Sequence, residues 1–204
     1  MKSFPTTLIL GLLASSALLH ATEPMRLAGY REKARVLGFS PDSKILLAVG
    51  REGGGNAIIA FDLQANTSRT VVENQALIHP ISVSSGTASV SWFDAKASSL
   101  NIIDLGTAAR LVKMRDDQPR FAPDELCFGL DGKTLFEARR TKPVRVWNTE
   151  DGKELAVLGN ATDGHMWVQL TADGKRLLIG GTDNGKFLGN GKGLLQIWDP
   201  AAKK

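Results

Sequence analysis

The sequence predicts an all-β fold made of four repeated units, and three observations support this prediction. A short run of β-branched and other apolar residues occurs four times and ends on Asp or Asn at positions 62, 104, 148 and 199, at intervals of 42, 44 and 51 residues. A turn signal rich in Ser, Asp or Gly precedes each run. No long stretch beyond residue 21 has the apolar spacing of an amphipathic helix. A fixed period of this size is typical of repeat architectures.

The first 21 residues predict a secretory signal peptide. Lys2 is followed by an uncharged, mostly apolar run over residues 8–19, and the small residue Ala21 ends the segment. The run is shorter than the roughly 20 residues that cross a bilayer comfortably. Cleavage after Ala21 would leave residues 22–204 as a periplasmic or extracellular domain without a membrane span. The alternative is that the segment stays attached as an uncleaved anchor.

Composition and charge are those of an ordinary globular domain. Hydrophobic residues make up 43% of the chain, and 25 basic residues against 21 acidic ones give a formal charge of +4. The dense basic stripe that a nucleic-acid-binding protein usually shows is missing, so we expect no nucleic-acid partner. The single cysteine, Cys127, cannot form an internal disulfide. The domain must therefore be stabilised by its packed core.

The first unit shows the expected order of strands and turns. Residues 35–40 and 44–49 are strand-like and are separated by a turn at Pro41 and Asp42. A glycine-rich hairpin over residues 53–56 leads to the strand-like run that ends at residue 62. Glycine favours such hairpins because it adopts positive φ at little steric cost. Residues 68–73 complete a unit of four strands.

The other three units repeat this order. Their turn signals are residues 84–86, 130–133 and 171–175, and a glycine-rich insertion over residues 185–193 lengthens the last interval. The fourth unit ends after its third strand, and residues 24–29 are expected to supply the missing strand. The predicted units are roughly residues 35–73, 81–114, 125–158 and 167–199.

These run ends and turns resemble the WD-repeat family of β-propellers, in a degenerate bacterial form. The resemblance covers about residues 25–204, although the family's Gly-His dipeptide has no clear counterpart and residues 139–142 replace the usual aspartate of the third unit. It implies a propeller of four WD-like blades, with the aromatic or aliphatic residue near the end of each run filling the gap between blades. The repeat positions are Phe61, Asp62, Ile103, Asp104, Trp147, Asn148, Trp198 and Asp199.

The closure of the propeller is left open by the sequence. Rings of the WD-repeat family usually hold more than four blades. Three arrangements therefore remain: a small four-bladed ring, an open arc, and a half-ring that pairs with a second copy as a homodimer. Trp167, at the start of the fourth unit, is a candidate for the rim of a central channel.

Motifs that would indicate catalysis or a cofactor are not found in the sequence. His79 and His165 have no partner at metal-ligand spacing, and the glycine-rich residues 189–193 lack the Ser or Thr that would follow the lysine of a phosphate loop. We therefore expect no cofactor, no metal and no enzyme activity. A hydrolase or lyase with a site at the central channel is the alternative, but the first strands offer Val36, Val83, Phe128 and Val168 there rather than acids or histidines.

The resemblance implies a binding platform. In WD-like propellers the loops between the second and third strands share one face, and here these loops carry more basic than acidic residues. A face of one sign raises the local concentration of oppositely charged partners. The hypothesis is a scaffold whose basic face binds an unknown protein through an acidic segment, or an anionic polymer. The candidate residues are Arg51, Lys96, Arg139, Arg140, Lys142, Lys186 and Lys192, against Glu52, Asp94 and Asp183.

Overall fold

The computed structural model describes residues 26–27, 35–52, 55–73, 77–84, 87, 89–94, 97–105, 110–115, 122–140, 142–159, 164–183 and 192–200. The predicted signal peptide lies outside these residues, as does most of the predicted strand at 24–29. The described residues include no candidate for a membrane-spanning helix.

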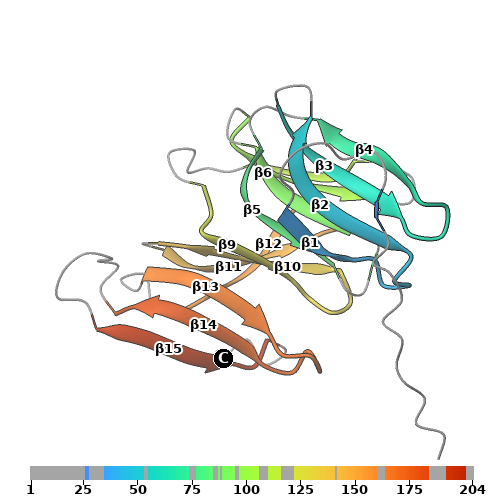
Figure 1. The fold of residues 1–204 in the computed structure, drawn as a ribbon. Helices are drawn as coiled ribbons and strands as arrows, with labels where there is room; N and C mark the ends of the chain where they lie inside the picture. The colour runs from blue at the N-terminus through green and yellow to red at the C-terminus, as the bar shows by residue number, and fades with distance from the viewer. Residues whose placement is uncertain are drawn as a thin grey trace, which may run out of the picture.

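The described residues form four antiparallel sheets, which we call blades 1 to 4 in chain order (Figure 1). Blade 1 contains β1 (Arg35–Phe39), β2 (Ile45–Glu52), β3 (Gly55–Asp62) and β4 (Thr67–Glu73). Blade 2 contains β5 (Leu77–Val83), β6 (Ser89–Asp94), β7 (Ser99–Asp104) and β8 (Arg110–Arg115). Blade 3 contains β9 (Glu125–Phe128), β10 (Thr134–Arg139), β11 (Lys142–Asn148) and β12 (Glu154–Leu158). Blade 4 contains β13 (Gly164–Leu170), β14 (Leu177–Thr182) and β15 (Gly193–Trp198).

Short polar side chains close the turns between the first and second strands. In blade 1, Ser40 Oγ donates a hydrogen bond of 2.6 Å to Asp42 Oδ1, which also accepts one of 3.1 Å from the Lys44 backbone N–H. In blade 4, Thr171 Oγ1 donates one of 2.6 Å to Asp173 Oδ1. These aspartates stabilise the turns because they satisfy backbone donors that the strands leave unpaired.

Acid is expected to weaken the fold through these turns. The hydrogen bond from Ser40 lowers the pKa of Asp42, and that from Thr171 lowers the pKa of Asp173, below the ordinary value of 3.8. Each of these pKa values is lower in the folded than in the unfolded chain. The stabilisation is therefore fully present when the pH is above the pKa of the unfolded chain, and it is lost as the pH falls through the pKa of the folded chain.

The variant Asp42→Asn/Asp173→Asn removes both titrations and keeps an acceptor oxygen in each turn. Its free energy of unfolding, measured with urea, is expected to fall less than that of the wild type between about pH 5 and pH 3. Equal slopes for the two proteins would contradict the assignment.

The blades follow one another in an arc. The first strands of consecutive blades lie together, β1 with β5, β5 with β9 and β9 with β13, as neighbouring blades of a propeller do. Among the described strands no comparable contact joins β13 back to β1, and Figure 1 shows blades 1 and 4 at opposite ends. Of the three arrangements that the sequence leaves open, the single chain adopts the open arc.

The sequence predicts that residues 24–29 supply the fourth strand of blade 4. The two residues of this segment that the structure describes do not form such a strand. Arg26 and Leu27 are not in a strand, and the sheet of blade 4 has the order β13-β14-β15 in the described residues. Leu27 packs instead against an apolar cluster of Ala48, Ala57, Ile59 and Phe61 on blade 1. Its side chain therefore covers blade 1, at the other end of the arc from β15.

The apolar cores lie between the blades. One cluster joins Leu47 and Ile58 of blade 1 to Val90 and Trp92 of blade 2. A second cluster joins blades 2 and 3, and a third joins blades 3 and 4. Because strand side chains alternate, each sheet has a forward face toward the next blade and a backward face toward the previous one.

The apolar member of each pair of repeat positions takes an equivalent place on the backward face of its blade. Each lies at or next to the end of the third strand of its blade, opposite an apolar residue near the start of the second strand. The pairs are Phe61 with Leu46, Ile103 with Val90, Trp147 with Leu135, and Trp198 with Leu177.

Candidate functional site

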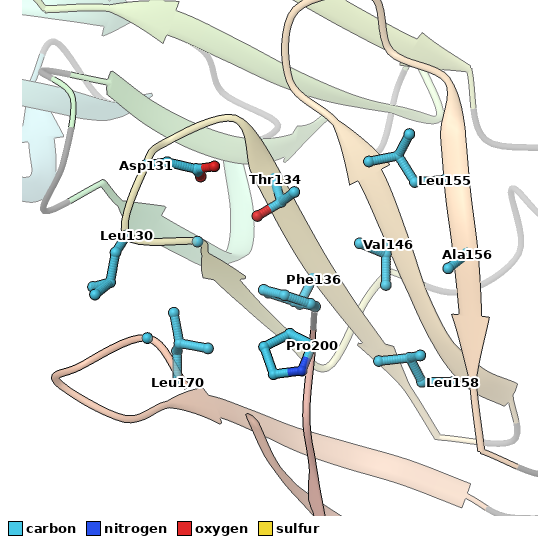
Figure 2. Close-up of a pocket in the computed structure, with 12 residues that line it drawn as sticks. Leu130, Asp131, Thr134, Phe136, Val146, Leu155, Ala156, Leu158, Leu170 and Pro200 are labelled. Atoms are coloured by element: carbon cyan, nitrogen blue, oxygen red, sulfur yellow. The ribbon is translucent and has the colours of Figure 1, made fainter. Parts of the chain in front are cut away.

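A groove of about 310 Å³ lies between blades 3 and 4. It opens beside the turns β9–β10 and β13–β14, and Figure 2 shows its side chains gathered from both blades. Leu130 and Leu155 are 39% and 45% exposed, whereas Phe136, Val146 and Leu158 are buried. The lining residues are Gly129, Leu130, Asp131, Thr134, Phe136, Val146, Leu155, Ala156, Leu158, Leu170, Gly174 and Pro200.

One wall of the groove depends on a contact between two turns. Leu130, in the β9–β10 turn, lies against Gly174 of the β13–β14 turn, where a Cβ atom would be 2.8 Å from Leu130 Cδ1. Gly174 also has a φ of 71°, which is the left-handed region that glycine tolerates. A Cβ atom at position 174 would therefore displace the Leu130 side chain from this place.

The chemistry of the groove is that of a binding site for an apolar group. Asp131 and Thr134 are the polar side chains of the lining, and both lie at the blade-3 edge (Figure 2). Asp131 Oδ1 already accepts a 2.9 Å hydrogen bond from the Lys133 backbone N–H. An apolar ligand with one flanking donor would match this lining.

The predicted basic face is only partly described. Lys96 and Lys186 lie outside the described residues, and Arg51 is in β2 with its side chain undescribed. Lys142, Lys192 and Arg140 are exposed. Arg140 forms an ion pair of 3.1 Å with Asp124, which also accepts a hydrogen bond of 2.6 Å from the Arg140 backbone N–H.

The prediction that Arg139 belongs to the exposed basic face is wrong. Strand β10 extends through Arg139, so this residue belongs to the sheet and not to the hairpin loop. It shares the backward face of blade 3 with Glu137, and both side chains are buried. Arg139 forms an ion pair with Glu137, and its guanidinium carbon is 6.0 Å from the centre of the Phe93 ring of blade 2. Arg139 is therefore unavailable to a partner at the surface.

The buried ion pair also involves a repeat position. Trp147 Nε1 donates a hydrogen bond of 2.7 Å to Glu137 Oε2. The Arg145 guanidinium carbon is 4.2 Å from the centre of the Trp147 ring, and Arg145 also forms an ion pair of 2.6 Å with Glu154. This network holds the indole in place between blades 2 and 3.

The histidine and first-strand candidates are placed as follows. His165 is buried, and its Nδ1 lies 2.8 Å from the Lys142 carbonyl oxygen. Within the described ranges, no group of three or more His, Cys, Asp or Glu residues could hold a metal ion. Phe128 and Val168 belong to the clusters between blades, and Val83 packs against another of them.

Four antiparallel sheets with their first strands side by side define an all-β fold of propeller blades. Solved structures share it: TolB from Acinetobacter baumannii has a TM-score of 0.63 at 20% identity, over 85% of this chain and 45% of that one. Kuenenia stuttgartiensis hydrazine synthase has a TM-score of 0.58 at 17% identity, over 86% of this chain and 51% of that one. The chain thus spans about half the length of these structures. No family model and no curated protein matches the sequence.

Proposed function

We propose that the chain is a secreted or periplasmic, non-catalytic scaffold that binds a protein partner through the groove between blades 3 and 4. The observation that carries this proposal is the open, largely apolar groove with two exposed leucines at its edge. Residues that dominate protein interfaces are large side chains seated in pockets of this kind. Membership of the WD-repeat family is part of the proposal, and the equivalent places of Phe61, Ile103, Trp147 and Trp198 support it.

The proposed ligand is an extended segment with an apolar side chain followed by a basic one. The apolar side chain would lie against Phe136, Leu158 and Leu170, which line the groove. The basic one would lie near the carboxylate of Asp131 at the edge. Such a segment would gain most from the desolvation of its apolar part, because an exposed ion pair contributes little.

A peptide library displayed on phage provides a direct test with a matched control. Ala156 lines the groove, whereas Val157, the next residue of β12, is exposed on the opposite face. Peptides selected on the wild type are expected to bind Ala156→Phe at least about tenfold more weakly, which is about 1.4 kcal/mol, and Val157→Phe with unchanged affinity. Leu155→Asp, at an exposed position of the groove edge, is expected to weaken the same peptides.

Peptides that bind both β12 phenylalanine variants as tightly as the wild type would place binding elsewhere and contradict the proposal. Failure to select any peptide would contradict it as well. Circular dichroism of Ala156→Phe distinguishes a filled groove from a disturbed fold, and Leu155→Asp tests the site without adding volume.

A further inference from the structure

The forward face of blade 4 is built like a face between two blades, but none of the described blades packs on it. In the third strands of blades 1 to 3, the residues three before the apolar repeat position are Ile58, Leu100 and Val144. They are 0%, 1% and 0% exposed. The equivalent residue of blade 4 is Leu195, which is 76% exposed. Blade 4 therefore presents to solvent a position that every other blade buries.

The residue immediately before the repeat position shows the same contrast. Ala60, Ile102 and Val146 are 3%, 0% and 7% exposed, whereas Ile197 of blade 4 is 67% exposed. Two cross-strand rows make up this face: Trp167 with Gly180 and Leu195, and Gln169 with Leu178 and Ile197. Neither row contains a charged residue. We call Trp167, Leu178, Leu195 and Ile197 the blade-4 flank.

Trp167, predicted as a candidate for a channel rim, belongs to this flank. Its side chain is 56% exposed, and a Cβ atom at Gly180 would lie 3.3 Å from its Cε3 atom. The indole therefore lies against Gly180 of the middle strand. A large aromatic side chain held in this way is preorganised to contact another surface.

The opposite end of the arc has a complementary surface. Val36 and Phe39 of β1 are 60% and 54% exposed, and their cross-strand partners, Ala48 and Leu46, lie on the backward face of blade 1. We call Val36 and Phe39 the blade-1 flank. Of the eight large apolar side chains that are exposed among the described residues, five belong to the two flanks.

We propose that the blade-4 flank of one copy packs on the blade-1 flank of a second copy, and that two such contacts close a ring of eight blades. Each of the three contacts between described blades joins a forward face to a backward face, and the first strands of the two blades lie together. Trp167 on β13 then meets Val36 and Phe39 of the partner subunit. Leu195 and Ile197 on β15 then meet Leu27 of the partner subunit, which packs on β2 and β3 of that face.

Two further observations favour a second copy as the occupant. The rows of the blade-4 flank are uncharged, so that burying them leaves no charge without a partner. The chain spans 45% and 51% of the two solved structures that share its fold, so two copies supply about the length of one. Two-fold closure uses both flanks of each copy and leaves no open end for a fibre.

The test is the mass of the purified chain in solution, measured by sedimentation equilibrium from about 1 to 100 µM. The wild type is expected to approach the mass of two copies. Leu195→Lys and Phe39→Lys are each expected to remain at the mass of one copy, because each change disrupts both contacts of the ring. Val157→Lys, an exposed apolar position on neither flank, is the matched control and is expected to pair like the wild type.

Mixing the two flank variants separates the proposed contact from its alternatives. The blade-4 flank of Phe39→Lys and the blade-1 flank of Leu195→Lys are both intact, so the mixture is expected to regain the mass of two copies through one contact. Pairing of Phe39→Lys alone would indicate blade-4 flanks packed on each other and would overturn the proposal. A wild type of one copy throughout, or one that grows beyond two copies, would also overturn it.

Discussion

Replacing Glu137 with alanine is expected to lower the free energy of unfolding by about 3–5 kcal/mol, because this is the usual cost of removing one partner of a buried ion pair. Glu137 is fully buried between blades 2 and 3, where it pairs with Arg139 and accepts the hydrogen bond of Trp147. The alanine variant leaves the Arg139 guanidinium buried without its carboxylate. Urea unfolding followed by tryptophan fluorescence measures the change.

Two further variants separate charge from packing. Glu137→Gln keeps an acceptor for Trp147 Nε1 and is expected to lose less stability than the alanine variant. Glu137→Met/Arg139→Met removes both charges and is expected to recover most of the loss, because apolar pairs of similar volume often replace buried ion pairs without penalty. An alanine variant within about 1 kcal/mol of the wild type would contradict this account.

Replacing Gly181 with alanine is expected to destabilise blade 4 by about 3 kcal/mol, at the upper end of the range for overpacking. A Cβ atom at Gly181 would collide with the Gly164 carbonyl oxygen and lie 3.1 Å from the His165 Cα atom. Backbone atoms of a paired strand cannot move aside as a flexible side chain can. The strands β13 and β14 would have to separate beside the irregularity between His165 and Trp167.

Gly193 provides the matched control for this change. It is paired with Thr182 in the same sheet, and a Cβ atom there would have no neighbour within 4 Å. Gly193→Ala is expected to leave stability unchanged or to raise it by about 0.5 kcal/mol, because alanine loses less backbone freedom on folding. Thermal unfolding of both variants by circular dichroism tests the contrast, and equal losses would show that the close approach at Gly181 is unimportant.

The all-β fold was predictable because its signals are local and repeated. A turn signal and an apolar run end occur once in each unit, and the structure confirms an all-β fold of four antiparallel sheets. Strand limits were less predictable. The first strand of blade 2 begins at Leu77, ahead of the expected residue 81, because its pairing with β6 passes over His79 and Pro80 in an irregularity.

The side chains of the candidate site were less predictable because they depend on contacts between distant residues. Arg139 reads as a hairpin charge in the sequence, yet it lies within a strand and is buried opposite a ring of the preceding blade. The groove needs Leu130 and Gly174 to meet across two blades. The leucine in the otherwise polar turn over residues 129–133 is a local signal that could have indicated it. Leu27 was expected to lie in a strand that completes the fourth unit, but it packs on blade 1. No local pattern in the sequence specifies which blade this residue contacts.

The separate clusters between blades have a consequence for how the molecule comes apart. In an array whose members contact only their neighbours, stability is close to a sum of terms for each member and for each junction. Blades 1 and 4 then have one junction each in the single chain, while blades 2 and 3 have two. The junction that holds Glu137 and Trp147 is the central one. Cooperative unfolding of the whole arc thus depends on this junction, and weakening it would let the two halves melt independently.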